Sequence, residues 1–446
     1  MKPRHIFWIM TDEQRLDTVT AGSGPMPVLT ELAAGGTRFE QAITPSPMCV
    51  PARTSLLTGS LPGATGVWRN RKNPSVAPPA PDLLDWLREA GYATVSLGKQ
   101  HYRLSRPAFD VEEDLVLSDL VDYTEYRNGR SHTNYGGVQF PGPTPWIMAG
   151  TFPGRTEETA EWRLVDRAIG MMRNLDRAQP ILMRLSFNAP HTPVAPPAEY
   201  VDAAPERFDT PPSFLRTNPE WPGWLRLLQQ SYADAGSLSG PELLTIRRHY
   251  YAQCAFLDAM IARFVSFLDD EGLLRESVVV FCSDHGTHLG EHGLVQKQSF
   301  FTESAVVPYC FAGADVARQS VRTPVSTRSL LPTAAALAGL ACPTRWRSLD
   351  YSDATRGGSG LASEPVVSQG MLNPALLDCD NRLVMVQRDN LRAVFDLDAP
   401  EERALLFDLD RDPHELESLD SDPSYDGSLG LLRGIAHESV TPAYDQ

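Results

Sequence analysis

Residues 278–286 read Val-Val-Val-Phe-Cys-Ser-Asp-His-Gly, an apolar run that ends abruptly in a carboxylate and an imidazole. Short runs rich in β-branched and aromatic residues are typical of a strand that is buried on both faces. The sequence therefore predicts a buried strand over 278–282, with Asp284 and His285 at its C-terminal end.

Three other stretches repeat this pattern of a buried strand followed by polar residues. The predicted strands cover 6–10, 92–97 and 181–187, and they lead into Asp12-Glu13, Gly98-Lys99-Gln100-His101 and Asn188-Ala189-Pro190-His191. Helical patterns over 80–90, 158–175 and 241–271 alternate with these strands. This order predicts an α/β fold with a largely parallel sheet. Because ligands bind at the carboxyl ends of such strands, the polar clusters predict one hydrolase-like site with a metal.

The residue types at this predicted site suit a divalent cation. Carboxylate oxygens favour Ca²⁺, Mg²⁺ or Mn²⁺, and the imidazole of His285 shifts the preference toward Mn²⁺ or Zn²⁺. Taken alone, Asp-His-Gly is more often a helix cap followed by a surface turn than a metal site. The polar ends of the other three strands are what favour the metal site.

The composition is that of an acidic globular protein. The chain has 446 residues, 42% of them hydrophobic, and a formal net charge of −16, which argues against general binding to nucleic acid or anionic membranes. No stretch approaches the ~20 apolar residues of a membrane span. Without a secretory pattern, and with six scattered cysteines, we expect a reduced, cytoplasmic setting.

The C-terminal part of the chain has a different pattern. A Gly-rich stretch over 355–360 follows the helix predicted near 329–340, and strands of a meander are predicted at 365–369, 382–387 and 391–397. We therefore expect a catalytic domain over residues 1–354 and a smaller C-terminal α+β subdomain with an antiparallel sheet over 355–446.

Residues 49–53, Cys-Val-Pro-Ala-Arg, form the most distinctive short motif. Read locally, Cys49 enters a helix whose first turn holds Pro51. A thiol near the positive end of a helix and beside Arg53 should have a lowered pKa. The alternative interpretation is a structural cysteine in a turn.

This Cys-x-Pro-x-Arg motif resembles the signature of the sulfatases, in the alkaline-phosphatase-like superfamily. The other matching elements, in family order, are the strand end at Asp12, Gly98-Lys99-x-His101, Pro190-His191-x-Pro193, Ser283-Asp284-His285-Gly286 with Lys297 beyond, Leu331-Pro332-Thr333 and Leu406-Phe407-Asp408-Leu409. The resemblance implies a large mixed, mostly parallel sheet flanked by helices.

The resemblance also implies a role for each matching residue. Cys49 would be converted to Cα-formylglycine by a formylglycine-generating enzyme, and one divalent ion, Ca²⁺ or Mn²⁺, would be bound beside it. The implied metal ligands are Asp12, Asp284, His285 and, in a position where relatives often carry Asp, Asn or Gln, Glu13. The other implied roles are support of the formylglycine hydroxyl by Arg53, charge neutralisation by Lys99 and Lys297, assistance of hemiacetal collapse by His101, and protonation of the leaving oxygen by His191.

The sequence thus predicts a sulfuric ester hydrolase that acts on a small alkyl, aryl or sugar sulfate. Two alternatives stay open: a phosphonate monoester or phosphodiester hydrolase that uses the same site, and a non-catalytic binding protein on the same fold. A homo-oligomer is compatible with the sulfatase prediction and with both alternatives. His288 and His292 lie among glycines that disfavour a regular helix, so we do not expect either to ligate the metal.

Overall fold

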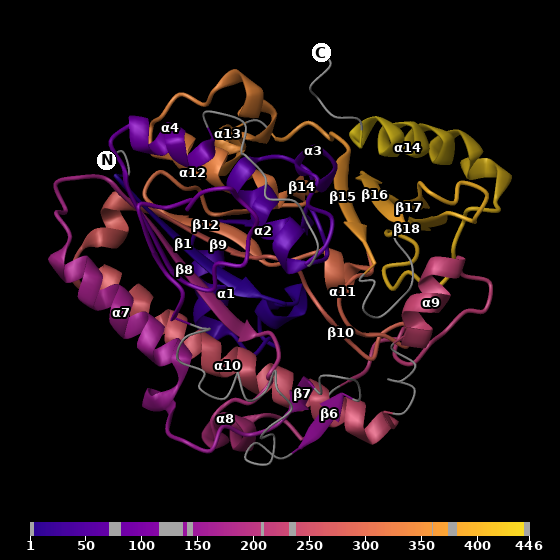
Figure 1. Cartoon of the computed structure of the whole chain (residues 1–446), viewed down its shortest axis with the longest axis horizontal. Helices are drawn as coiled ribbons and strands as arrows, with labels where there is room; N and C mark the ends of the chain where they lie inside the picture. The colour runs from indigo at the N-terminus through magenta and orange to yellow at the C-terminus, as the bar shows by residue number, and fades with distance from the viewer. Residues whose placement is uncertain are drawn as a thin grey trace.

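The computed structural model describes residues 4–70, 82–115, 137–140, 146–206, 209–231, 238–358, 360–372 and 381–440. An eight-stranded sheet with the order β13-β2-β12-β9-β1-β8-β4-β5 lies at its centre (Figure 1). The strands are β1 (His5–Asp12), β2 (Thr37–Phe39), β4 (Ala93–Gly98), β5 (Val111–Glu113), β8 (Ile181–Pro190), β9 (Ser277–Ser283), β12 (Tyr309–Gly313) and β13 (Gln319–Val321). Each pairs in parallel with its neighbours except β12, which is antiparallel to β9 and β2. The predicted mixed, mostly parallel sheet is confirmed.

The four predicted strands are neighbours at the centre of this sheet, in the order β9-β1-β8-β4. Their register aligns their C-terminal ends: Thr11 of β1 pairs with Ser283 of β9, and Gly98 of β4 pairs with Ser186 of β8. The residues that follow these strands therefore meet at one edge of the sheet.

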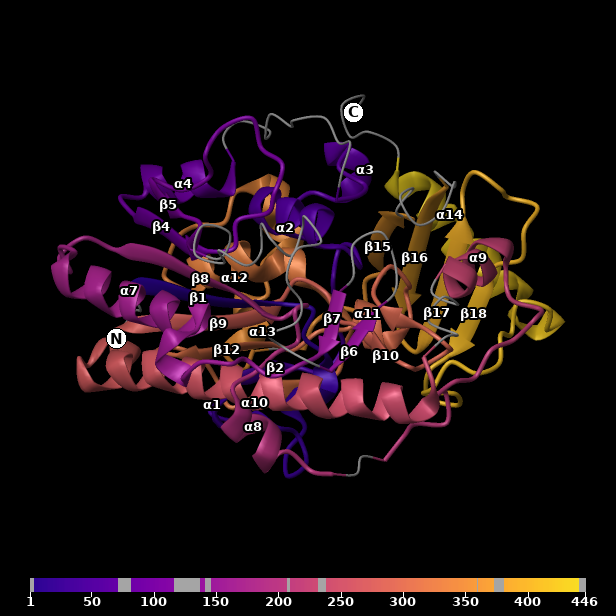
Figure 2. The ribbon, with the colours of Figure 1, turned by 60° about the horizontal axis from the view of Figure 1, so that its bottom comes forward.

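Two layers of helices cover the sheet, and Figure 2 shows the strands between them. Phe7 and Ile9 of β1 belong to a core with buried apolar residues of α1 (Pro27–Ala34), α7 (Ala160–Asn174) and α10 (Gly240–Asp270). Ile6 and Trp8 belong to a second core with α2 (Cys49–Thr58), α4 (Leu83–Glu89) and α12 (Leu330–Leu337). Because successive side chains of a strand point to opposite faces, the apolar run of β1 supplies both cores.

Helix α10 lies within one residue of the helix predicted over 241–271, but it is more apolar than expected. Its 31 residues include a window that is long and apolar enough to cross a membrane by length and composition alone, contrary to the expectation stated above. However, 67% of that window is buried inside the molecule, and α10 packs against α1, α7 and β8. It therefore occupies the place of a core helix.

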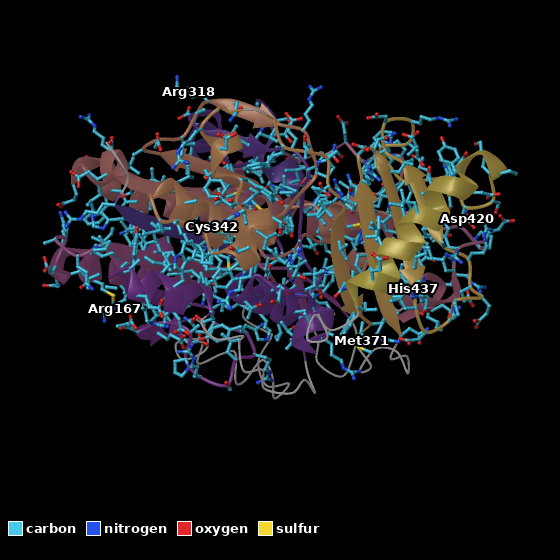
Figure 3. All side chains as sticks on the ribbon, turned by 90° about the horizontal axis from the view of Figure 1, so that it is seen from above. Arg167, Arg318, Cys342, Met371, Asp420 and His437 are labelled. Carbon is cyan, nitrogen blue, oxygen red and sulfur yellow. The ribbon has the colours of Figure 1, made fainter. Side chains whose placement is uncertain are left out.

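The C-terminal residues form a separate antiparallel sheet with the order β15-β16-β17-β18. Its strands are β15 (Val366–Met371), β16 (Arg382–Arg388), β17 (Leu391–Asp396) and β18 (Leu405–Asp408), and α14 (Asp426–Ser439) packs against β16 and β17. Figure 3 shows this unit, with Asp420 and His437 labelled, at the opposite end of the molecule from Arg167 of α7. The meander is as predicted, with β18 as an additional strand, while the domain boundary near residue 355 stays a prediction.

Shorter elements connect these layers. They are β3 (Ala42–Ile43), α3 (Pro62–Thr65), β6 (Val138–Phe140), β7 (Trp146–Ala149), α8 (Ala198–Ala203), α9 (Gly223–Ser231), β10 (His288–Leu289), β11 (Val295–Gln296), α11 (Thr302–Ala305), β14 (Val325–Ser326) and α13 (Ser352–Thr355). The β10–β11 hairpin follows directly from the end of β9, so it places Lys297 near the residues that end the central strands.

Candidate active site

The polar residues that end the central strands surround Cys49, the first residue of α2. Its side chain is fully buried. Its Sγ lies 3.2 Å from Lys297 Nζ, 3.2 Å from His285 Nε2 and 3.6 Å from Asp12 Oδ1. The structure thus brings together, around one sulfur atom, residues that are up to 285 positions apart in the sequence.

Arg53 lies one helical turn after Cys49 and is also fully buried. Its Nε donates to Asp284 Oδ2 at 2.7 Å, and its Nη2 donates to Asp12 Oδ2 at 3.0 Å. Its Nη1 donates to the carbonyl of Lys99 at 3.0 Å and to Ser186 Oγ at 2.8 Å. One planar guanidinium therefore fixes both carboxylates and the start of the segment that carries Lys99 and His101.

Because Arg53 binds the Oδ2 atom of both aspartates, their Oδ1 atoms face the sulfur and His285. His285 Nε2 lies 3.6 Å from Asp284 Oδ1 and 3.9 Å from Asp12 Oδ1. One ligand atom from each of Asp12, Cys49, Asp284 and His285 lies within 4.8 Å of the others. His285 Nδ1 lies 2.9 Å from the Gly286 carbonyl, which orients the ring so that Nε2 faces this space. The four donors fit a divalent ion.

The charges at the site are strongly coupled. Burial, together with the neighbouring Asp12 carboxylate, raises the pKa of Asp284 to about 6, as expected for two acids that share a small volume. Burial also acts to raise the pKa of Asp12. The cations around this carboxylate, Lys99 first among them, outweigh burial and hold its pKa well below the usual value. A cation between the two Oδ1 atoms would relieve their repulsion, which supports the fit to a metal.

The thiol of Cys49 has an environment that favours the thiolate. Burial and the Asp12 carboxylate each act to raise its pKa, but Lys297, His285 and Lys99 outweigh them, and the pKa lies well below its usual value. This agrees with the lowered pKa that the sequence predicts for this cysteine.

Glu13 lies beside the four-donor group, and its assignment as a metal ligand stays a prediction. Its Oε1 lies 2.9 Å from Lys297 Nζ, and its Oε2 lies 3.9 Å from His191 Nε2. It is not part of the four-donor group; it belongs to an overlapping group with Asp12 and His191. Glu13 also adopts a left-handed backbone conformation, with φ of 65°, which turns the chain immediately after β1. The structure therefore presents Glu13 as the ion-pair partner of Lys297.

The two lysines contact the acids of the site. Lys99 Nζ lies 2.7 Å from Asp12 Oδ2 and 3.1 Å from Asn188 Oδ1. Burial acts to lower the pKa of both Lys99 and Lys297, but Asp12 and Cys49 raise it for Lys99, and Cys49 and Glu13 raise it for Lys297. Both side chains are therefore held in the ammonium form beside the sulfur.

The two histidines assigned to proton transfer lie on different sides of this cluster. His101 hydrogen-bonds to Cys49. Residue 101 as a whole is exposed, but the protein around its imidazole ring lowers the pKa of the ring. His191 is buried, and its Nδ1 lies 2.6 Å from the Thr192 carbonyl, which leaves Nε2 facing Glu13. The structure thus places one imidazole at the sulfur and the other beside Glu13.

Asn70 also lies at the site, although it was not among the predicted site residues. Its Oδ1 accepts from the Val50 backbone amide at 3.0 Å, and its Nδ2 lies 3.9 Å from Cys49 Sγ. No spacing or motif in the sequence marks this asparagine, because it reaches the site only through the turn after α3. His288 and His292 lie outside both donor groups found among the described residues.

Comparison with known proteins identifies the family of the chain and its fold. The family model described as Sulfatase matches residues 4–340. A choline-sulfatase from Rhizobium meliloti is 27% identical over 409 residues, covering 89% of this chain and 78% of that protein. Arylsulfatase K from Danio rerio is 29% identical over 331 residues, covering 71% of this chain and 60% of that protein.

Solved structures share the fold over nearly the whole chain. A 2-O GAG sulfatase superposes with a TM-score of 0.74 at 22% identity, covering 99% of this chain and 92% of that one. A phosphonate monoester hydrolase from Silicibacter pomeroyi superposes with a TM-score of 0.77 at 19% identity, covering 97% and 94%. At sequence identities of 22% and 19%, these superpositions show a shared fold only.

Proposed function

The chain belongs to the sulfatase family of sulfuric ester hydrolases, and on that basis we propose that it cleaves a small alkyl, aryl or sugar sulfate at the Cys49 site. The position of Cys49 carries this proposal. Its Sγ lies 3.2 Å from both Lys297 Nζ and His285 Nε2. A nucleophile derived from this residue would be formed among groups that stabilise negative charge.

We propose that Cys49 is oxidised to formylglycine and that a single divalent ion, Ca²⁺ or Mn²⁺, is held by Asp12, Asp284 and His285. Two carboxylates and one imidazole with facing donor atoms support this assignment. When bound, such an ion supplies positive charge that polarises a sulfuryl oxygen and lowers the pKa of a hydroxyl on residue 49.

The remaining side chains have roles that follow from their positions. Arg53 orients the two aspartates, as its hydrogen bonds to both Oδ2 atoms require. Lys99 and Lys297 place two ammonium groups where charge develops on the sulfuryl oxygens. His101, in contact with residue 49, accepts a proton from it, and His191 donates a proton to the leaving oxygen.

A phosphonate monoester is the second candidate substrate class. The phosphonate monoester hydrolase noted above shows that one fold serves both ester types, and sulfuryl and phosphoryl groups have similar shapes. The choline-sulfatase and arylsulfatase K relatives favour the sulfate ester, because they match this chain at higher sequence identity.

The test is a comparison of kcat/KM for choline sulfate, 4-nitrophenyl sulfate and a phenylphosphonate monoester, with Ca²⁺ and with Mn²⁺. We expect a sulfate ester to give the highest value. Cys49→Ala should lower it by about 10³-fold or more. Cys310→Ala is the matched control, because Cys310 is also buried but lies on β12. A phosphonate preference would support the second candidate, and turnover that is unchanged in Cys49→Ala would refute the proposal.

A further inference from the structure

A buried arginine outside the catalytic cluster has an unusual environment. Arg184, on β8, is fully buried; among the described residues no ion pair joins it to a carboxylate, and Glu112 and Asp114 act on its charge only from a greater distance. Its guanidinium lies against aromatic rings, 4.7 Å from the centroid of Phe109 and 5.3 Å from that of Trp8. An unpaired buried charge is costly, so the contacts that Arg184 does make indicate what it is for.

Arg184 makes two side-chain hydrogen bonds, to two partners that are themselves hydrogen-bonded to each other. Its Nε donates to Ser96 Oγ at 2.9 Å, and its Nη2 donates to Gln100 Oε1 at 2.5 Å. Ser96 Oγ also lies 2.9 Å from Gln100 Oε1. In the part of the chain that the structure describes, the Nη1 atom has no hydrogen-bond partner. The charge of Arg184 is therefore directed mainly at the side-chain oxygen of Gln100.

Gln100 lies between two residues of the active site, Lys99 and His101. Its Nε2 donates to the backbone carbonyl of Gly98 at 2.9 Å, so the side chain folds back over the turn that carries it. The turn itself is tight: Gly98 has a φ of 90°, and a Cβ there would lie 2.2 Å from the Ser186 carbonyl oxygen. His101 also has a positive φ, 43°. Such a backbone persists only where its surroundings hold it in place.

We propose that Arg184 is a positioning residue for catalysis. Through Gln100 it fixes the turn over residues 98–101, and so sets the positions of Lys99 Nζ and the His101 ring at Cys49. Arg53 also holds this turn, through the Lys99 carbonyl. Two guanidinium groups therefore contact the turn, one that belongs to the catalytic cluster and one that does not.

The alternative is that Arg184 only fills space in the core. In that case its replacement would lower stability but leave the turn and the catalytic rate alone. Variants of Gln100 distinguish the two roles. Gln100 is only partly buried, so its replacement should have little effect on core packing.

The test uses variants of both partners in the full-length protein, and it rests on the proposed function. We expect Gln100→Leu and Arg184→Met each to lower kcat/KM by about tenfold to a hundredfold, because small displacements of catalytic groups have effects of this size. The double variant should lose no more than either single variant, since both break the same contact. Gln100→Glu keeps an oxygen acceptor for Arg184 but loses the donor to the Gly98 carbonyl, so it should retain more activity than Gln100→Leu without reaching the wild-type value.

Phe109→Leu is the matched control, because Phe109 packs on Arg184 but cannot hydrogen-bond to Gln100 through its side chain; the variant should lower stability while kcat/KM is retained. Hydrogen exchange gives a readout that is independent of turnover. The Lys99 amide, which donates to the Ser186 carbonyl at 2.8 Å, should exchange faster in Gln100→Leu and Arg184→Met than in Phe109→Leu.

Wild-type kcat/KM and wild-type exchange in Gln100→Leu would overturn the inference, as would losses that multiply in the double variant. If Arg184→Met does not fold, Gln100→Leu and Gln100→Glu decide the matter. If the wild-type protein hydrolyses neither ester class, the proposed function fails, while exchange at Lys99 still tests the positioning role.

Discussion

At the scale of single residues, the site depends on how Arg53 divides the oxygens of two aspartates. Its guanidinium takes the Oδ2 atoms of Asp12 and Asp284 and leaves the Oδ1 atoms facing Cys49 and His285. A lysine could not make these contacts together, because it carries a single donor nitrogen instead of a planar fork.

We therefore predict that Arg53→Lys destabilises the protein by about 3 kcal/mol in the presence of a chelator, because part of a buried charge network is left unpaired. The value of kcat/KM should also fall, because the carboxylate oxygens of Asp12 and Asp284 lose their orientation. Denaturant unfolding and kcat/KM check the two effects. Arg247→Lys provides the comparison: Arg247 is a buried arginine paired with Glu291, and its replacement should affect stability much more than kcat/KM. Unchanged stability and activity in Arg53→Lys would contradict this account.

At the scale of elements, the segment that follows β9 holds histidines that serve the fold. His292 stacks on Phe301 with 3.7 Å between ring centroids, and His288 Nε2 lies 2.6 Å from Ser299 Oγ. Burial lowers the pKa of each to about 3. Both imidazoles are therefore neutral in the folded protein at neutral pH.

This has a consequence for stability below neutral pH. The unfolded chain takes up protons on these histidines near pH 6.5, but the folded chain does not do so until about pH 3. Stability from this source is present above pH 6.5 and lost as the pH falls toward 3. Between pH 7 and pH 5, proton uptake by each histidine in the unfolded chain should lower the free energy of unfolding by about 2 kcal/mol. In urea unfolding, His292→Phe should show a smaller loss over this interval than the wild type; an equal loss would contradict the assignment.

The elements also show what the sequence could and could not predict. The four central strands were predictable because each is an apolar run that ends in polar residues, and a parallel sheet brings such ends together. The partner of Glu13 was not predictable, because Lys297 reaches it only through the hairpin after β9. The same holds for Asn70 and for the contact between Arg184 and Gln100, which depend on how distant segments pack.

At the scale of the whole molecule, a buried ion pair within the C-terminal part hydrogen-bonds to the segment after Lys297. Arg392 of β17 and Glu415 lie 2.8 Å apart, and both side chains are almost fully buried. Glu415 Oε2 accepts from the Thr302 backbone amide at 2.7 Å, and Arg392 Nη1 donates to Thr302 Oγ1 at 2.9 Å. The C-terminal residues thus hold the start of α11.

We predict that Glu415→Gln lowers stability by about 3 kcal/mol, because Arg392 is left buried without its carboxylate. The control is Glu417→Gln at a neighbouring exposed position, which should have an effect within about 0.5 kcal/mol. Denaturant unfolding measures both. A fragment of residues 1–354 should lose these contacts entirely and unfold at a lower temperature than the full chain. Wild-type stability in that fragment would show that the C-terminal sheet does not support the catalytic part.

The central claim is that residue 49 works as formylglycine. The most direct measurement is the mass of the tryptic peptide that covers residues 39–53, from protein made in a host that converts other sulfatases. The account predicts a peptide in which the thiol-bearing CH₂–SH group has become an aldehyde, with the loss of one sulfur and two hydrogens and the gain of one oxygen. An unmodified cysteine in that peptide, in protein that hydrolyses sulfate esters, would contradict it.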